Sequence, residues 1–463
     1  MSTRIETGAL SPQTVRDWTR AHVLTSWSAQ RAVNPLPIAE AKGATLVGAE
    51  GKTYLDFSSG LVNVNLGHGH PRVVRAIQEQ AARLCYVTPN FGSDARAALA
   101  RALHEVSPGR ALTRTLFTNG GAEANENAVK MARAVTGRHK ILTAYRSYHG
   151  ATYGAITLTG DNRRWPAEPG IPGVVHFFAP YPYRSPFGAP PEQEAAAALH
   201  HLEQVIESEG PTTIAAILLE PVVGTNGVIV PPDGYLQGVR ALCDRHGILL
   251  IIDEVMTGLG RTGRWWASEH WGIVPDMLTF AKGVTSGYVP LGGVSVSEPI
   301  GRYFDDHVLW GGLTYSGHPL ACAAGVACVA AYQEEGLVER AERLGAGLRD
   351  ALCGLAERHP SIGEVRGLGL FYGVELVRDR ATREPLVPWN SPTQGAVGEM
   401  LRDLLARGVY LFSRWNILIV APPLVIAEDE IGRAVEALDA SLVIADRAAT
   451  DRAPADRAGH ATA

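Results

Sequence analysis

Short apolar runs, each about the length of a β-strand, alternate along the chain with longer segments of helical periodicity. The clearest runs are 214–219, 248–252 and 277–281, and weaker ones are 115–118, 140–144 and 292–296. Runs that are apolar at nearly every position are typical of strands buried on both faces of a parallel sheet. Helices between such strands cover the two faces. The alternation therefore predicts an α/β fold with a mostly parallel sheet.

The pattern changes near residues 325–335, where strand and loop signals give way to long helices. A helical segment at 337–355 is followed by short apolar segments at 369–376 and 417–420. The chain of 463 residues is long enough for a large unit and a smaller partner. The first dozen residues are polar, and the stretch from about 445 mixes Ala, Asp and Arg without aliphatic periodicity. We expect both ends to be loose tails.

Charge and cysteine usage exclude several classes of partner. The 42 basic and 47 acidic residues give a formal net charge of −5, so no basic field exists to hold nucleic acid or an anionic membrane. The 5 cysteines are scattered without a Cys-x-x-Cys pair, which argues against a disulfide framework or a zinc site. His68 and His70 have no cluster of Cys, Asp or Glu close in sequence, so a turn is favoured over a metal site.

Signals for secretion or membrane insertion are missing from the sequence. Residues 1–30 lack the apolar core of a signal peptide. No apolar run reaches the roughly 18 residues that a membrane span needs. We therefore expect a cytoplasmic protein that binds no metal.

Two ionisable residues follow buried strands directly. Asp253 ends the run at 248–252, and Lys282 follows the run at 277–281. Ligands of open α/β sheets bind beyond the carboxyl ends of the strands. Desolvation there lowers the pKa of a lysine and makes its amine a nucleophile or base. The alternatives are that Asp253 caps the next element and that Lys282 is an ordinary surface residue.

A third strand ending predicts an anion site. The run at 115–118 leads through Asn119, Gly120 and Gly121 into a helical pattern, and a helix N-terminus offers free N–H groups to a phosphate. The segment matches neither the dinucleotide nor the P-loop pattern. An amine, a carboxylate and a phosphate seat together indicate pyridoxal 5′-phosphate. Tyr148 could stack on its ring, although Tyr148 and His149 taken singly are more often packing residues.

These residues belong to a longer series of motifs that resembles one family. The chain is similar, from about residue 37 to 426, to the class III (subgroup II, ω-type) aminotransferases of the fold-type I pyridoxal-phosphate enzymes. Asp253-Glu254-Val255 running into Gly260-Arg261-Thr262-Gly263 is the most telling stretch. The other motifs are at 54–56, 67–71, 118–126, 148–150, 220–221, 227–232, 281–283, 314–319 and 421–424.

The resemblance implies a particular division of the chain. Residues 67–330 would form the large cofactor-binding domain, with its mostly parallel sheet flanked by helices. A smaller α+β domain would combine residues from both termini, 1–66 and 331–445, and 446–463 would be a disordered tail. The active unit would be a homodimer or a dimer of dimers, with active sites at the subunit interface.

The resemblance also assigns roles to the residues that bind the cofactor. Lys282 resembles the Schiff-base lysine, which also moves the proton between substrate and cofactor carbons. Asp253 resembles the partner of the pyridine nitrogen. The remaining cofactor contacts implied are Gly120, Gly121 and Ala122 at the phosphate, Tyr148 and Val255 on the two ring faces, His149 beside Tyr148, and Thr314 at the phosphate of the neighbouring subunit.

Fewer residues match the family at the positions that select the substrate. Arg414, in a short loop before the strand expected at 417–420, is the nearest match to an arginine that swings in to bind a substrate carboxylate. Glu220 resembles a glutamate that can pair with it. Where many amine-accepting relatives have Trp, this chain has Gly60, Leu61 and Val62, so either the pocket is wider or its aromatic wall comes from Trp27. Tyr148 would also contact the substrate. Met256 stands where the ornithine- and γ-aminobutyrate-type branch usually has Gln, which favours the pyruvate-linked branch.

The expected activity is a reversible ping-pong transfer of an amino group from an ω-amino acid or primary amine to an α-keto acid, with pyruvate as the expected acceptor. The same scaffold and cofactor could instead serve an aminomutase, epimerase or phospho-lyase, since fold fixes cofactor better than reaction. A non-catalytic cofactor-binding protein would need neither Lys282 nor Asp253. A nicotinamide oxidoreductase lacks its glycine fingerprint in this sequence.

Overall fold

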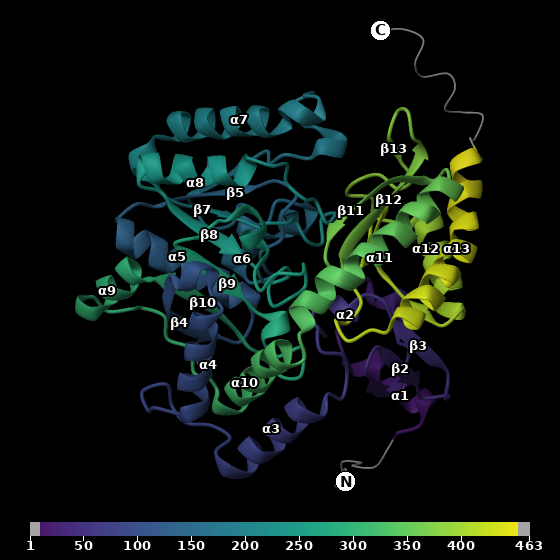
Figure 1. The fold of residues 1–463 in the computed structure, drawn as a ribbon, viewed down its shortest axis with the longest axis horizontal. Helices are drawn as coiled ribbons and strands as arrows, with labels where there is room; N and C mark the ends of the chain where they lie inside the picture. The colour runs from purple at the N-terminus through teal and green to yellow at the C-terminus, as the bar shows by residue number, and fades with distance from the viewer. Residues whose placement is uncertain (1–9, 452–463) are drawn as a thin grey trace.

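The computed structural model describes residues 10–451. The larger part of the molecule contains a seven-stranded sheet (Figure 1). The strand order is β4-β10-β9-β8-β7-β5-β6. Strand β10 runs antiparallel to both of its neighbours, and the pairs from β9 to β6 are parallel. The strands are β4 (Leu112–Thr118), β5 (Lys140–Ala144), β6 (Val174–Phe177), β7 (Ile214–Leu219), β8 (Leu249–Asp253), β9 (Met277–Phe280) and β10 (Gly292–Ser297). The predicted mostly parallel α/β sheet is confirmed.

Both faces of this sheet are covered by helices, which explains the continuous apolar runs. In β7, Ile217 and Leu219 pack with α7 (Glu194–Glu209) and α8 (Tyr235–His246), which lie together on one side of the sheet (Figure 1). The alternate residues Ala216 and Leu218 join the core with α5 (Gly121–Thr136) on the other face. Burying each aliphatic side chain contributes about 1.5–3 kcal/mol.

A second sheet lies in the other half of the molecule (Figure 1). Its order is β11-β12-β16-β15 with β13 beside β12, and its pairs are antiparallel. The predicted segments at 369–376 and 417–420 correspond to β12 and β16. The strands are β11 (Ile362–Leu368), β12 (Phe371–Asp379), β13 (Glu384–Pro385), β15 (Phe412–Arg414) and β16 (Ile417–Val420).

A third sheet joins the two ends of the chain. Its order is β1-β2-β3-β14, and β3 pairs in parallel with β14, so that Leu55 lies opposite Val409. This pairing attaches the N-terminal strands to the C-terminal part of the chain, and in Figure 1 the purple strands lie below the C-terminal helices. The strands are β1 (Ile38–Lys42), β2 (Thr45–Gly48), β3 (Thr53–Asp56) and β14 (Val409–Tyr410).

The remaining helices connect and cover these sheets. Helix α3 begins with Pro71 at its first turn, as its sequence predicts. No helix within residues 10–451 combines the length and apolar character needed to cross a membrane. These helices are α1 (Pro12–His22), α2 (Ser59–Val62), α3 (Pro71–Arg83), α4 (Asp94–Glu105), α6 (Tyr153–Leu158), α9 (Glu298–Asp306), α10 (Pro319–Glu334), α11 (Leu337–Arg358), α12 (Gly395–Ala406) and α13 (Glu428–Thr450).

The last helix extends further than the sequence pattern indicates. Helix α13 continues to Thr450, beyond the boundary expected at 445. The buried face repeats every three or four residues through Leu438, Leu442, Ala445 and Ala449. The last two residues of this buried face are alanines. The helical repeat is therefore present in the segment, but no Val, Leu or Ile marks it in the sequence. The rest of the expected tail, 452–463, lies outside the described residues, as do residues 1–9.

Candidate active site

Lys282 and Asp253 lie at the same edge of the large sheet. Strand β8 ends at Asp253, and β9 is followed by Ala281 and Lys282, the first residue of a 3-10 turn. The two strands are parallel neighbours, with Asp253 opposite Thr279, so their carboxyl ends meet. Both side chains line one cavity of about 510 Å³. The site therefore forms where parallel α/β sheets bind ligands.

Three donors fix the orientation of the Asp253 carboxylate, which is 4% exposed. Asn125 Nδ2 on α5 donates to Oδ2 at 2.7 Å, and the Val255 amide donates to Oδ1 at 3.0 Å. His149 Nδ1 lies 2.8 Å from Oδ2, and its Nε2 lies 3.2 Å from the Thr143 hydroxyl. Contacts from three separate elements hold this carboxylate in one position.

The Lys282 amine has an environment that favours its neutral form. Desolvation lowers the pKa of Lys282, while Asp253 and Glu220 oppose that shift and Arg163 adds to it. The backbone of Lys282 has φ 44, in the left-handed region that side chains rarely adopt. A neutral amine held in a strained position is a nucleophile or a proton acceptor.

The start of α5 forms the anion seat that the sequence predicts. Gly120, the N-cap residue, provides no side-chain cap to the helix. Gly121 and Ala122 in the first turn line the cavity, where N–H groups have no acceptor within the helix. A Cβ added at Gly121 would lie 2.8 Å from Val255, so the close approach of these segments requires glycine. The helix dipole adds attraction for an anion.

Tyr148 and Val255 also line the cavity, and Glu220 holds the segment of Tyr148 in place. Glu220 Oε1 accepts from the Tyr148 amide at 3.0 Å, and Oε2 accepts from the Gly224 amide at 2.7 Å. The pKa of Glu220 is raised to about 7, because burial outweighs the opposing charge of His149 and the charge of Asp253 acts in the same direction as burial. The carboxylate thus bonds backbone amides rather than Arg414.

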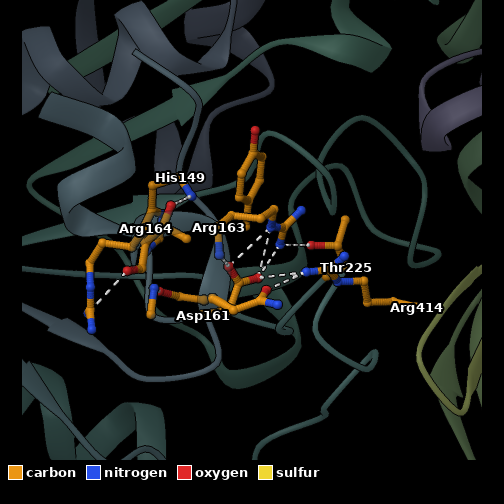
Figure 2. Close-up of polar contacts among 12 residues, drawn as sticks. His149, Asp161, Arg163, Arg164, Thr225 and Arg414 are labelled. Carbon is orange, nitrogen blue, oxygen red and sulfur yellow. Dashed lines mark hydrogen bonds and ion pairs between the residues drawn. The ribbon is translucent and has the colours of Figure 1, made fainter. Parts of the chain in front are cut away.

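Two arginines, Arg163 and Arg414, lie around Asp161 (Figure 2), and Arg163 also contacts Tyr148. The Arg163 guanidinium lies 3.8 Å from the centre of the Tyr148 ring. Arg163 Nε donates to both oxygens of buried Asp161, at 3.1 and 2.9 Å, and Nη2 donates to Thr225 Oγ1 at 3.0 Å. Arg414 Nη2 lies 3.9 Å from Asp161 Oδ2 (Figure 2). One carboxylate therefore serves two cations, which leaves an excess positive charge.

Arg414 is the last residue of β15, whereas the sequence suggests that it lies in a loop before a strand. Its Nη2 donates to Asn162 Oδ1 at 2.8 Å, and its guanidinium lies 4.1 Å from the ring centre of Trp415. Within residues 10–451, Nε of Arg414 is buried without a hydrogen-bond partner. Desolvation and the charge of Arg163 together lower the pKa of Arg414 to about 10, against the opposing charge of Asp161.

The structure brings most of the residues predicted for the site into one cavity. Five other predicted residues do not line it. Trp27 meets Tyr148 edge-on with ring centres 6.3 Å apart, Leu61 is 61% exposed, and Val62 is buried in an apolar cluster with Met256. Thr314 is exposed, and Arg414 lies beyond Asn162. The predicted residues that line the cavity are Gly120, Gly121, Ala122, Tyr148, His149, Glu220, Asp253, Val255 and Lys282.

Sequence reasoning missed several residues of the site. Asn125 and Thr225 line the cavity, and Arg163 and Asp161 lie beside Tyr148. The position of Asn125 could be anticipated, because it lies one helical turn after Gly121 and faces the same way. Nothing local to Arg163 indicates that it stacks on Tyr148.

Fold and cavity together define a fold-type I pyridoxal-phosphate enzyme, and comparisons with known proteins identify its family. The model of the family "Aminotransferase class-III" matches residues 27–442. A taurine–pyruvate aminotransferase of Rhodobacter capsulatus is 37% identical over 450 residues, covering 91% of this chain and 95% of the relative. The chain belongs to the class III aminotransferases. It is therefore a pyridoxal-phosphate-dependent aminotransferase of the ω type.

Solved structures agree with this assignment. The taurine:2-oxoglutarate aminotransferase of Bifidobacterium kashiwanohense, in complex with PLP and glutamate, has a TM-score of 0.92 and 44% identity, covering 95% of this chain and 99% of that one. An (S)-enantioselective ω-transaminase of Thermomicrobium roseum has a TM-score of 0.90 and 40% identity, covering 95% and 100%. The predicted family, fold and cofactor are confirmed.

The cavity fits pyridoxal phosphate on its own chemistry. The uncapped start of α5 supplies N–H donors for a phosphate. Asp253 supplies a buried carboxylate for the ring nitrogen, and Lys282 supplies an amine for the aldehyde. Two further residues, Tyr148 and Val255, supply an aromatic and an aliphatic surface for the ring.

Proposed function

We propose that the protein transfers the amino group of an ω-amino acid with a remote acidic group to an α-keto acid, with pyruvate as acceptor. One observation carries this proposal: Asp253 and Lys282 lie at the ends of two neighbouring parallel strands, and both line the same cavity. The transfer proceeds in two half-reactions, so donor and acceptor use the same cavity in turn.

The residues of the cavity have separate tasks in this proposal. Bound pyridoxal phosphate supplies an electron sink for the carbon that carries the amino group. Lys282 Nζ would hold the cofactor through its aldehyde, and its free amine would move a proton between carbons. Asp253 keeps the proton on the ring nitrogen, and His149 and Asn125 hold Asp253 in place. The amides of Gly121 and Ala122, at the turn formed by Gly120, bind the phosphate, while Tyr148 and Val255 enclose the ring.

The arginines beside Tyr148 support an acidic donor. Arg163 and Arg414 share the single carboxylate of Asp161, and the excess cation can bind a carboxylate or sulfonate. Taurine is named in two of the relatives described above. We assign the remote acid to this end of the cavity, where Arg414 can leave Asn162. Trp27 flanks the same end in this proposal, because its ring centre lies 6.3 Å from that of Tyr148 and 5.8 Å from the Arg163 guanidinium.

A second subunit is part of the proposed active unit. Thr314 is exposed, and its carbonyl accepts from the Tyr86 hydroxyl at 2.9 Å. Tyr86 meets Tyr315 edge-on at 6.0 Å, and both rings are exposed together with Phe91 and Trp310. Exposed aromatic groups of this kind mark interaction surfaces. We propose a homodimer or a dimer of dimers in which Thr314 reaches the phosphate of the neighbouring subunit.

The visible absorbance of the purified holoenzyme tests the reaction. Taurine should bleach the band of the bound cofactor, and pyruvate should restore it, whereas the matched amine without the sulfonate, ethylamine, should act far more weakly. Restoration by 2-oxoglutarate instead of pyruvate would correct the acceptor. Product formed without any keto acid would replace the proposal with an aminomutase, epimerase or lyase reaction.

A further inference from the structure

A second cavity of about 370 Å³ lies behind two segments that also border the active site. Tyr145 and Arg146 line this second cavity, whereas Tyr148 and His149, just beyond them, line the first. Val223 lines the second, and Thr225 of the same segment lines the first. The two cavities share no lining residue. The second cavity is therefore a separate compartment.

Arg146 is the unusual residue of the second cavity. Its guanidinium carbon lies 5.0 Å from the ring centre of Tyr181 and 4.8 Å from that of Trp389. No residue in the described part of the chain gives its side chain a hydrogen bond or an ion pair. Aromatic rings interact with the face of a guanidinium, but its in-plane N–H groups still require acceptors. Those donors are available to a ligand.

Neighbouring charges leave Arg146 without a counter-ion. Glu375 accepts from Arg184 Nε at 2.5 Å and from Arg366 Nη1 at 2.7 Å, and Tyr181 also donates to it. Glu364 pairs with Arg366. Among these five residues three guanidinium groups face two carboxylates, which leaves one positive charge in excess, while Arg383 acts on Glu364 from outside this group. Arg184, which also lines the cavity, has a buried Nη2 without a partner in the described residues.

The backbone conformation of Arg146 also indicates that this residue has a function. Its φ of 61 lies in the left-handed region, which is unfavourable for a residue with a side chain. Such strain persists where the surroundings enforce it, and it concentrates at ligand-binding and active sites. Desolvation also lowers the pKa of Arg146, so the buried cation is not fully compensated by its neighbours.

We propose that the second cavity binds a small organic monoanion with an aromatic or branched apolar body. Its carboxylate accepts from the free N–H groups of Arg146, and its body packs against Tyr145, Phe178 and Trp389. A single negative charge balances the excess cation, whereas a polyanion would meet Glu375. The volume lies in the range of small-molecule pockets.

Calorimetric titration of the holoenzyme with benzoate, and with neutral benzamide as its matched control, tests the proposal. Wild-type protein should bind benzoate saturably and benzamide at least about 10-fold more weakly, because a charge-assisted hydrogen bond is lost. Arg146→Gln should weaken benzoate binding about 10-fold or more. Arg414→Gln should leave this binding unchanged, because Arg414 does not line the second cavity.

Two further measurements keep the outcome decisive. Arg146→Gly removes the side chain while glycine tolerates the backbone conformation, so it guards against misfolding of the glutamine variant. A crystal soaked with benzoate should show the ligand beside Arg146 and not solely beside Arg163. Absent binding by the wild type, undiminished binding by Arg146→Gly, or benzoate confined to the Arg163 side would each overturn the proposal.

Discussion

The strand-end pair and the arginine cluster differ in how the fold holds them. Asp253 is 4% exposed and receives contacts from α5, from the segment of His149 and from the chain after β8. The Arg414 side chain is 24% exposed and has one side-chain hydrogen bond, to Asn162. A side chain held by several contacts suits a group that must be placed precisely against a reacting atom, whereas a side chain with few contacts can adjust to different ligands. We infer that chemistry belongs to the first region and substrate selection to the second.

The largest effect should follow from Lys282→Ala. Turnover should be abolished, because no other residue described in the cavity offers an amine. Cofactor should still bind through its phosphate seat, which absorbance and dialysis would measure. Lys130→Ala, on α5 outside the cavity, is the control and should retain activity. Retained turnover in Lys282→Ala would end the assignment of chemistry to the strand ends.

A smaller but still large effect is expected for Asp253→Asn. Turnover should fall about 100-fold or more, because the ring nitrogen loses its charged partner. Glu254→Gln is a matched control, since Glu254 is equally buried but bonds Thr257 and the backbone at 267–268 away from the cavity. Single-turnover kinetics would compare the two variants. Equal rates in both would remove Asp253 from the mechanism.

Arg163→Met should act on affinity for the donor rather than on the chemical step. Loss of a hydrogen bond to a charged group costs about 1.5–3 kcal/mol, so the KM for taurine should rise roughly 10- to 100-fold. Methionine still packs on Tyr148, but Asp161 loses its partner. The double variant Asp161→Asn with Arg163→Met restores the charge balance and should keep the defect. Kinetics with ethylamine should be unchanged, and a similar loss with ethylamine would contradict a selective role.

The smallest effect concerns Glu220, which lies between the two regions. Its folded pKa of about 7 is above the ordinary 4.5, so the folded state binds the proton more tightly. The contribution of Glu220 to the free energy of unfolding is fully present below pH 4.5 and is lost as the pH rises through 7. The unfolding free energy should therefore decrease between about pH 4.5 and 7, by at most about 3 kcal/mol from this group. Denaturant titrations of Glu220→Gln should show a weaker decrease, and an equal decrease would contradict this origin.

The strand-end residues could be predicted because their positions follow from local sequence. A parallel strand buried on both faces is a continuous apolar run, and the residue after it lies at the ligand-binding edge. That rule predicts the positions of Asp253 and Lys282, and the glycine pair before a helix start predicts that of Gly121. Strand β6 was not predicted, since its four residues include His176 and give too short an apolar run.

The arginine cluster could not be predicted, because it depends on contacts between distant segments. Arg163 stacks on a residue 15 positions earlier and bonds Thr225 after β7, and neither spacing is a helical or strand repeat. The resemblance supplied Arg414 but placed it in a loop, whereas it ends β15 opposite Ile417. Side-chain partners of this kind become visible when the tertiary fold is known.

The pairing of β3 with β14 has a consequence for how the chain folds. Residues of β3 form their last strand contact with Val409 and Tyr410, far along the chain. Contacts of such sequence separation form slowly, and the large sheet, built from residues 112–297, can assemble first. During synthesis the edge of β3 therefore stays unpaired until β14 has been made. An unpaired strand edge can pair with another chain. Refolding of the whole protein should accordingly be limited by closure of this small sheet, with aggregation as the competing outcome.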